Sequence, residues 1–569
     1  MSPPTQRPGF GWLRWLPGLV LAILTLPIAA GLAGALLPSF GYHPALDASG
    51  FTLEHWHRLI SRPGFLLSGS LCLWVGLAST ALSLMLVILL LARFHEGYMF
   101  WIVRRTLSPL LSVPHVAMAV GLAFVIAPSG LIFRIGSMFW ARPLLPPDIL
   151  TVHDRYGLAL IGGLVLKEAP FIFLMCLAGL AQIDDRRMRS LAASMGYSPS
   201  LAWLKTVLPR LYPQIRLPVL AVLAYAVSVV DMALILGPTT PPTLAVLTLR
   251  WMGEPDLNAQ FVGSAAAIAV LLVTVFAITV WLLGERVVAA VSARWLQGGE
   301  RQRGERVISG LAMAGGAIAL SFILLSFASL ILWAFAESWL GARPVPDGFT
   351  MHNWLAYART FTAPLWNSVV IGVGSALIGL ILVIAVLERD VRAGEAGGSV
   401  RALIYLPLLM PQIAFLPGLQ ILLLSVGPAE SLATTISVHL LFVLPYVYLS
   451  LSEPWTHFDA RYRQTALALG ASPNRALFSI RLPMMLRAVL TAFAVGFAIS
   501  VGQYLPTLLL ASGRLPTITT EAVAISAGGD RRLVALYALL QTLLPLIGFG
   551  LAGLVPAMVF RNRRKLRLA

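Results

Sequence analysis

The chain has 569 residues, of which 58% are hydrophobic and 11% are charged, and its formal net charge is +17. A soluble globular protein of this length cannot cover its surface with so few charged side chains. The basic residues lie at the ends of apolar segments rather than together in one polar region, which argues against a nucleic-acid-binding protein. The composition predicts an all-α polytopic membrane protein surrounded by lipid.

Twelve apolar segments approach or exceed the length of about 20 residues that a helix needs to cross a bilayer. Most of the 41 Lys and Arg residues fall on one side of the membrane if the N-terminus lies in the cytoplasm. We therefore expect a multi-pass protein of the bacterial inner membrane whose N-terminus and C-terminus are both cytoplasmic. The predicted spans are approximately residues 15–37, 68–92, 106–127, 157–181, 214–237, 261–284, 307–335, 367–387, 402–426, 432–452, 487–511 and 534–559.

An internal repeat relates the first six spans to the last six. Matching positions include Pro114 and Gly121 with Pro411 and Gly418, Ser70 with Ser368, and Pro242-Thr243-Leu244 with Pro516-Thr517-Ile518. Because each half has an even number of spans, the two halves share one orientation and are related by an axis along the membrane normal. We expect a first membrane domain at residues 1–296, a short polar linker at 297–306 and a second membrane domain at 307–569. The first half is longer, and its additional residues are expected near 128–156.

A short polar segment precedes the fifth span of each half, on the predicted cytoplasmic side. Its serine can cap a helix, the proline that follows suits the first helical turn, and the glycine permits a tight turn before them. The pattern therefore predicts a helix, a glycine turn and a second helix in each half. The matching residues are Ala192, Gly196, Ser198, Pro199, Leu208 and Pro209 in the first half, and Ala466, Gly470, Ser472, Pro473, Leu482 and Pro483 in the second.

This repeated pattern resembles the cytoplasmic loop of the inner-membrane permeases of binding-protein-dependent ABC importers. The resemblance covers essentially the whole chain, as two fused permease domains, and is strongest to the branch that imports thiamine and ferric iron. It implies the type I importer fold, in which the loop forms a coupling helix that docks in a cleft of the ATPase subunit. It also implies two copies of a cytoplasmic ATPase and a periplasmic substrate-binding protein as partners, with thiamine or ferric iron as the cargo.

One departure from the family pattern concerns the charge of the loop. The family usually has a glutamate six residues before the glycine, where this chain has Ser190 and Gln464. This chain therefore lacks the carboxylate with which other members of the family would form an ion pair with the ATPase. Neighbouring acidic and basic residues could supply charge instead, or form only a solvated face; they are Asp184, Asp185, Arg186, Arg187 and Arg189 in the first loop, and Asp459, Arg461 and Arg463 in the second.

Catalytic residues are not apparent in the sequence. The only lysines are Lys167, Lys205 and Lys565, and none follows a glycine, so the chain has no Gly-x-x-x-x-Gly-Lys phosphate loop. Energy from ATP would therefore come from a separate chain. We expect no enzyme activity, no cofactor and no metal site, and we interpret Cys72 and Cys176 as small buried apolar residues.

Several polar residues lie within the predicted spans, where they are costly and usually face a cavity or a polar partner. We predict that some of them line a translocation path, although interhelical hydrogen bonds would also explain them. The acidic members favour a cationic cargo. The candidates are Glu168, Asp231, His115, Gln412 and Gln503, with Lys167 beside Glu168 and His439 as a further polar residue.

Two other classes of protein remain open from these residues. An ion-coupled secondary transporter could use Lys167, Glu168 and Asp231, but it needs no pair of loops to bind ATPases. A membrane scaffold that transports nothing would not need polar residues within its spans.

Overall fold

The computed structural model describes residues 15–43, 50–98, 100, 101, 103, 112–139, 146–302, 304–341, 343–394, 403–426 and 431–561. Regular structure in these residues is helical, and no strand extends beyond an isolated bridge such as that between Ala336 and Phe349. The predicted all-α class is confirmed.

Helices of the first half follow the predicted spans, with short helices between them. In chain order they are α1 (Leu16–Ser39), α2 (Glu54–Ser61), α3 (Phe65–Phe94), α5 (His115–Ile126), α6 (Leu131–Gly136), the 3₁₀ helix η3 (Ser137–Phe139), α7 (Leu158–Leu180), α8 (Asp185–Ser194), α9 (Pro199–Ala202), the π-helix η4 (Trp203–Val207), α10 (Leu208–Ser228), α11 (Asp231–Leu236), α12 (Leu244–Met252) and α13 (Leu257–Gln297).

Helices of the second half repeat this order, apart from the segment after the third span. They are α14 (Glu305–Phe335), α15 (His352–Ala356), α16 (Ala358–Ala393), the 3₁₀ helix η5 (Leu403–Tyr405), α18 (Leu406–Leu409), α19 (Gln412–Val426), α20 (Leu432–Thr456), α21 (Ala460–Ala468), α22 (Pro473–Ala476), the π-helix η6 (Leu477–Arg481), α23 (Leu482–Met484), α24 (Leu486–Val501), α25 (Leu505–Ala511), α26 (Ile518–Ser526) and α27 (Arg531–Val559). Residues 127–157 separate α5 from α7, whereas only residues 427–431 separate α19 from α20, in agreement with the predicted place of the additional residues.

Ten helices in the described residues are long and apolar enough to cross a membrane, and two bent helix pairs raise the number to as many as twelve. One bent pair is Leu403–Leu409 with Gln412–Leu424, which meet at 97°. The span predicted at residues 106–127 has its helix only from His115, because Pro114 disfavours helical backbone at the residue before it. Residues 106–111 of that span lie outside the described residues.

The fifth predicted span of each half is not one continuous helix. In the first half α10 ends at Ser228, Val229 has extended backbone, and α11 begins at Asp231. In the second half α24 ends at Val501, and α25 begins at Leu505 after a short connection. Both breaks leave polar groups at membrane depth, which is tolerated only where the backbone is buried in protein or lines a cavity.

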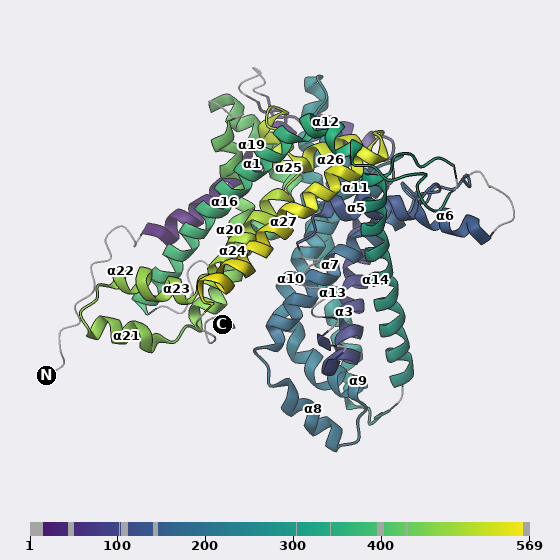
Figure 1. The fold of residues 1–569 in the computed structure, drawn as a ribbon. Helices are drawn as coiled ribbons and strands as arrows, with labels where there is room; N and C mark the ends of the chain where they lie inside the picture. The colour runs from purple at the N-terminus through teal and green to yellow at the C-terminus, as the bar shows by residue number, and fades with distance from the viewer. Residues whose placement is uncertain are drawn as a thin grey trace.

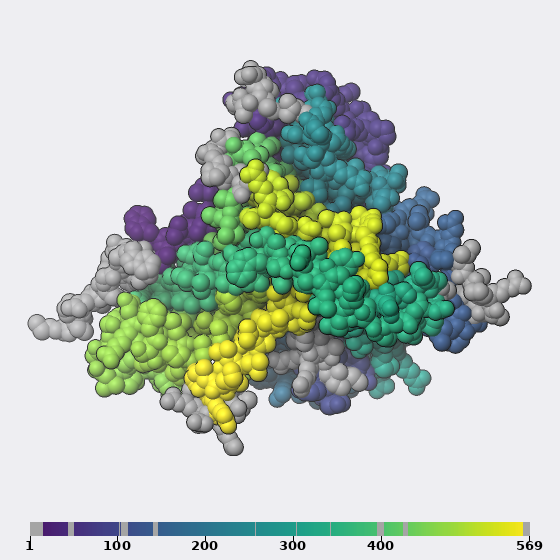
Figure 2. Space-filling model, turned by 45° about the horizontal axis from the view of Figure 1, so that its top comes forward, coloured from purple at the N-terminus to yellow at the C-terminus, as the bar shows by residue number. Residues whose placement is uncertain are grey.

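The two halves form two lobes that meet at one end of the molecule (Figure 1). In each half the first helix packs on the other half: α1 lies along α19, and α14 lies along α5 and α3. In Figure 2 the purple residues of the N-terminal part accordingly lie against green residues of the second half. The two halves are therefore joined by exchanged helices as well as by the linker.

Glycines at matching positions of the repeat make these exchanged contacts possible. A Cβ at Gly418 would lie 2.1 Å from the carbonyl oxygen of Gly31 in α1, and one at Gly121 would lie 2.9 Å from the Cβ of Ser326 in α14. Such contacts between small residues let helix backbones approach closely within a membrane. The pair Gly121 and Gly418, found in the sequence as a repeat, thus has the same structural role twice.

Candidate functional site

The two polar loops have the same succession of elements. Loop segment 1 (residues 184–209) contains α8, a turn, α9 and η4, and loop segment 2 (residues 459–483) contains α21, a turn, α22 and η6. Gly196 has φ +85° and Gly470 has φ +84°, a left-handed conformation that strains any residue with a Cβ. Both segments lie at the end of their lobe away from α12 and α26 (Figure 1). The structure therefore has the predicted helix–glycine–helix shape in both halves.

The serine caps of the second helices differ between the halves. The side chain of Ser472 accepts a hydrogen bond from the amide of Arg475 at 3.2 Å and caps α22 as expected. The side chain of Ser198 does not cap α9, which corrects the expectation for that residue. Its hydroxyl instead donates to Glu305 Oε2 at 2.7 Å, because the start of α14 lies against the turn.

Each loop segment exposes large apolar side chains on an otherwise polar surface. Met195 and Leu469, which occupy matching positions directly before the glycines, are 57% and 82% exposed. Leu191, Tyr462 and Phe478 are exposed as well. Exposed apolar groups that cluster within a polar region are typical of protein–protein interaction sites.

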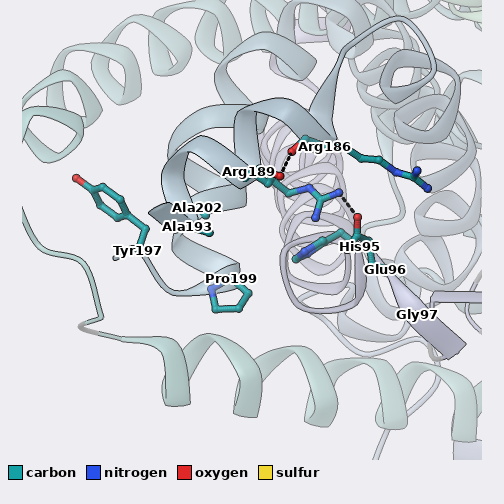
Figure 3. A pocket seen from close by; sticks show the side chains of 10 residues that line it. His95, Glu96, Gly97, Arg186, Arg189, Ala193, Tyr197, Pro199 and Ala202 are labelled. Carbon is teal, nitrogen blue, oxygen red and sulfur yellow. Dashed lines mark hydrogen bonds and ion pairs between the residues drawn. The ribbon is translucent and has the colours of Figure 1, made fainter. Parts of the chain in front are cut away.

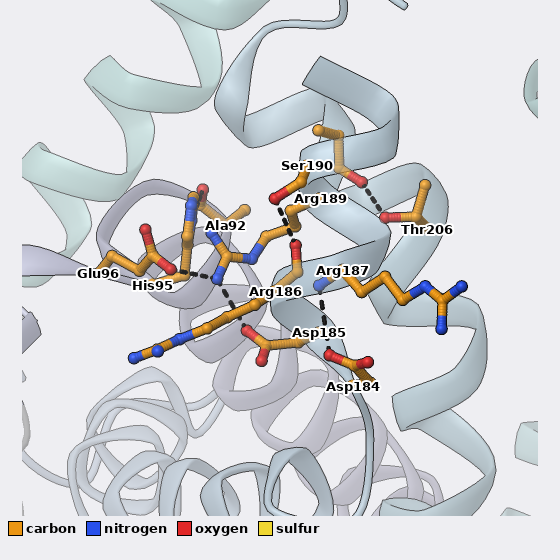
Figure 4. A network of polar contacts seen from close by, with 11 residues as sticks. Ala92, His95, Glu96, Asp184, Asp185, Arg186, Arg187, Arg189, Ser190 and Thr206 are labelled. Atoms are coloured by element: carbon orange, nitrogen blue, oxygen red, sulfur yellow. Dashed lines mark hydrogen bonds and ion pairs between the residues drawn. The ribbon is translucent and has the colours of Figure 1, made fainter. Parts of the chain in front are cut away.

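A cleft of about 670 Å³ lies beside α8 (Figure 3). In its wall the guanidinium of Arg189 is held by two carboxylates: it pairs with Glu96 just after α3 and with Asp185 Oδ2 at 3.0 Å (Figure 4). Ser190 donates to the carbonyl oxygen of Arg186 at 2.9 Å. The cleft is lined by His95, Glu96, Gly97, Arg186, Arg189, Ser190, Ala193, Tyr197, Pro199 and Ala202.

Arg189 also affects the titration of the two residues that follow α3. The pKa of Glu96 lies below its ordinary value, chiefly because Arg189 donates a hydrogen bond to its carboxylate. The pKa of His95 is also lowered, first by burial and then by the positive charge of Arg189. The wall of the cleft therefore keeps Glu96 ionised and His95 neutral at pH 7.

The linker and the start of α14 bind loop segment 1. Glu305 accepts hydrogen bonds from the hydroxyls of Ser198 and Ser200, each at 2.7 Å. The amide of Ser198 donates to the carbonyl oxygen of Arg301 at 2.8 Å. Lys205 donates to the carbonyl oxygen of Gly298 at 2.8 Å. These contacts join the first loop to the beginning of the second half.

Loop segment 2 is anchored by a buried ion cluster. Arg481 pairs with Glu388 of α16 at 3.1 Å and stacks over the ring of Trp455 at 4.2 Å. Glu388 also pairs with Arg392 at 2.9 Å, and Arg392 donates to Asn474 Oδ1 at 3.0 Å. The carboxylate is thus satisfied from two sides, as a buried charge requires.

A second cavity, of about 330 Å³, lies between the two halves. All five residues predicted from the sequence for a path contribute to its wall, although they come from different helices; they are His115, Glu168, Asp231, Gln412 and Gln503. Lys167 lines it too. The helix breaks at Pro114, Val229, Met410 and Gly502 also lie in this wall, so the irregular backbone faces a cavity.

Polar residues of this cavity bond to one another within each half. His115 Nε2 lies 3.0 Å from Glu168 Oε1, and Gln412 Nε2 donates to Gln503 Oε1 at 3.2 Å. His439 does not line the cavity; it is buried and bonds to Ser500 and Thr507. His439 therefore forms interhelical hydrogen bonds, which is the alternative to lining the path.

Three tyrosines of the cavity are among the lining residues that the sequence did not single out. Tyr225, Tyr446 and Tyr504 line the cavity, and the hydroxyl of Tyr225 donates to Asp231 Oδ1 at 3.3 Å. Tyrosine is common in apolar segments, so its presence there is a weak signal. Its position beside a helix break, as for Tyr504, is the feature that could have identified it. Within the described residues no group of three or more His, Cys, Asp and Glu side chains could hold a metal ion.

Comparison with known proteins gives relatives over most of the chain. The family described as "Binding-protein-dependent transport system inner membrane component" matches residues 394–560. The chain is similar to the inner membrane ABC transporter permease protein YnjC of Escherichia coli K12, with 32% identity over 529 residues, 92% of this chain and 94% of that protein.

Shorter relatives match one half of the chain. The putative 2-aminoethylphosphonate transport system permease protein PhnV of Salmonella typhimurium is 26% identical over 40% of this chain and 86% of its own length. The molybdenum transport system permease protein ModB of Mycobacterium bovis is 28% identical over 36% of this chain and 78% of its own length.

Proposed function

Because this chain belongs to the family of binding-protein-dependent ABC importer permeases, we propose that its two halves, residues 1–296 and 307–569, are two membrane domains that enclose one translocation path. The cavity between the halves supports this proposal, since both halves contribute polar residues to it. Helix breaks at matching positions lie in its wall, as in other transporters with discontinuous helices. The path residues are His115, Glu168, Asp231, Gln412 and Gln503.

The single observation that carries the coupling role is the matched pair of loop segments. Each presents an exposed apolar residue, Met195 or Leu469, directly before a glycine with positive φ. Each loop segment docks one ATPase subunit, so one chain binds two copies. The ATPase active sites lie on those separate subunits. Closure of the two ATPases on ATP moves the loops together and switches the halves as rigid bodies.

The remaining partners follow from the topology. The excess of Lys and Arg supports a cytoplasmic position for the loop segments, the N-terminus and the C-terminus. The opposite face, which carries α12 and α26, receives a periplasmic binding protein. The spans lie in the lipid bilayer of the bacterial inner membrane.

The cargo follows from the acidic residues of the cavity. Glu168 and Asp231 favour a cation, for which thiamine and ferric iron are our candidates. The names of PhnV and ModB refer to 2-aminoethylphosphonate and molybdenum, so these relatives do not support thiamine or iron. Binding assays with the periplasmic partner decide the cargo. An ion-coupled secondary transporter is not favoured, because the relatives are ABC permeases.

Replacement of both loop glycines tests the coupling role. We expect the double variant Gly196→Val with Gly470→Val to insert in the membrane but to lose association with the ATPase subunit that the unchanged chain binds. Valine at positive φ costs roughly 1–2 kcal/mol per site and displaces the exposed residue before it. The measurement is co-purification of the ATPase with the full chain.

A matched control uses two other glycines with positive φ, Gly341 and Gly513, which have φ +63° and +78° and open space around them. The double valine variant at these positions should retain the ATPase. Normal ATPase yield with the loop variant would exclude the proposed coupling role of the two segments.

A further inference from the structure

The central cavity combines two carboxylates with three tyrosine rings. Asp231 and Glu168 come from the first half and are 8% and 6% exposed. Tyr225 comes from the same half, whereas Tyr446 and Tyr504 come from the second. The wall of the cavity therefore brings two carboxylates of the first half together with phenol groups from both halves.

Some of these groups are already paired within the cavity wall. Glu168 bonds to His115, and the carboxylate of Asp231 accepts a hydrogen bond from the hydroxyl of Tyr225 at 3.3 Å and lies at backbone amides at the start of α11. The hydroxyls of Tyr446 and Tyr504 have no hydrogen-bond partner among the described residues. An ionised carboxylate and a phenol oxygen are both acceptors. A donor from a bound molecule could therefore complete the acceptors that line the cavity.

We propose that this cavity binds the primary ammonium group of a small organic solute during its passage. The ammonium group supplies three N–H donors for the carboxylate of Asp231 and the neighbouring phenol oxygens, and its charge is attracted to the faces of the tyrosine rings. This inference rests on the proposed function, because it takes the cavity as part of the translocation path. It names a class of cargo different from thiamine and ferric iron, neither of which carries a primary ammonium group, and it gives a role to the three tyrosines.

The charges of the cavity oppose the alternative of an anionic solute. Lys167 is the one Lys or Arg among the described residues of the wall, and it is adjacent in sequence to Glu168. An anion would therefore have to approach two buried carboxylates to reach a single ammonium group. A volume of about 330 Å³ is at the lower end of the range of pockets that enclose small molecules, which limits the solute to a small one.

Three probes of the same chain length separate charge from shape. The full chain in lipid nanodiscs is titrated with putrescine, 1,4-butanediol and succinate, and binding is followed by saturation-transfer difference NMR. We expect signal from putrescine, with an affinity at least about tenfold above that for 1,4-butanediol, and no competition by succinate. Equal binding of the diol or the diacid would overturn the proposal, as would absence of binding by putrescine.

Variants localise the site. Asp231→Asn should weaken putrescine binding about tenfold or more, and Asp231→Glu should restore part of it. Tyr504→Phe keeps the ring and loses the hydroxyl, so we expect a smaller loss than with Tyr504→Leu. Asp347→Asn, which changes an exposed carboxylate outside the cavity, is the control and should bind as the unchanged chain does. Unchanged binding by Asp231→Asn would contradict the proposal.

ATPase association separates this inference from the proposed function. Asp231→Asn should co-purify with the ATPase as well as the unchanged chain does, which also shows that the variant is folded. Loss of putrescine selectivity with normal ATPase association rejects only the ammonium site. Failure of the unchanged chain to bind any ATPase rejects the permease function itself.

Discussion

Loop segment 1 is held by hydrogen bonds from the linker and α14, whereas loop segment 2 is held by a buried cluster of ions beneath it. The backbones are alike, with a glycine of positive φ between two helices in each case. The position that matches Arg481 is Val207, and the position that matches Glu388 is Leu90. Where the second half buries an ion pair, the first half has apolar residues at the two matching positions, and both are buried.

This difference shows that the repeat preserves shape while the chemistry that stabilises it varies. A buried ion pair is often no more stabilising than apolar residues of similar volume, because desolvation of the charges offsets their attraction. The two anchors also connect to different partners. Loop segment 2 is fixed to α16 of its own half, whereas Glu305 fixes loop segment 1 to the first helix of the opposite half.

The largest effect should follow from breaking the buried cluster. Glu388→Ala leaves Arg481 buried without its carboxylate, which costs roughly 3–5 kcal/mol. Protection of the amides of residues 460–468 against hydrogen exchange should fall strongly, and the amides of residues 185–194 should be unaffected.

A double variant sharpens the same comparison. Glu388→Leu with Arg481→Val copies the apolar pair Leu90 and Val207 of the first half, and we expect it to regain most of the lost protection. If the amides of residues 460–468 exchanged as fast in the double variant as in Glu388→Ala, an apolar pair could not replace the ion pair in loop segment 2.

A smaller effect is expected at the linker contact. Glu305→Ala removes the acceptor of the hydroxyls of Ser198 and Ser200, which costs about 1–3 kcal/mol. Amide exchange in residues 185–202 should become faster, while residues 460–476 keep their protection. Glu305→Gln retains one acceptor oxygen. Its amide exchange in residues 185–202 should therefore be faster than in the unchanged chain and slower than in Glu305→Ala. An equal response in both loops would mean that Glu305 acts on the whole chain rather than on its own loop.

Local features of the sequence predicted much of what the structure contains. The apolar segments predicted an all-α membrane protein because a helix is the form that satisfies its own backbone groups within lipid. The glycine turn predicted before each Ser-Pro is present, and both Gly196 and Gly470 have positive φ there. The five polar residues of the spans converge on one cavity because burial in apolar surroundings leaves them few other partners.

Features set by contacts between distant segments could not be predicted. The break at Val229 contains neither glycine nor proline, so nothing local identifies it. The bond from Ser198 to Glu305 depends on the path of the linker. The packing of each first helix on the opposite half leaves only an indirect trace in the sequence, the repeated glycines Gly121 and Gly418. Their role is clear only from the structure, where Gly418 lies against Gly31 and Gly121 against Ser326.

The smallest effect concerns pH and should occur in loop segment 1 alone. Arg189 lowers the pKa of Glu96, and the position that matches Glu96 in the second half is Gly394, so loop segment 2 has no corresponding carboxylate. A carboxylate with a lowered pKa contributes stability that is present above its ordinary pKa, 4.5 for Glu96, and is lost as the pH falls through the folded-state value. The carboxylate is half exposed and screened by solvent, so the contribution is below about 1 kcal/mol.

Comparison of exchange protection at pH 6 and pH 4 measures this contribution. Residues 185–194 should lose slightly more protection at pH 4 than residues 460–468, after correction for the intrinsic exchange rates. Glu96→Gln removes the titrating group, so the difference between the two loops should disappear in that variant. A pH response of residues 185–194 that persists in Glu96→Gln would assign the titration to another carboxylate, for which Asp185, the second partner of Arg189, is the candidate.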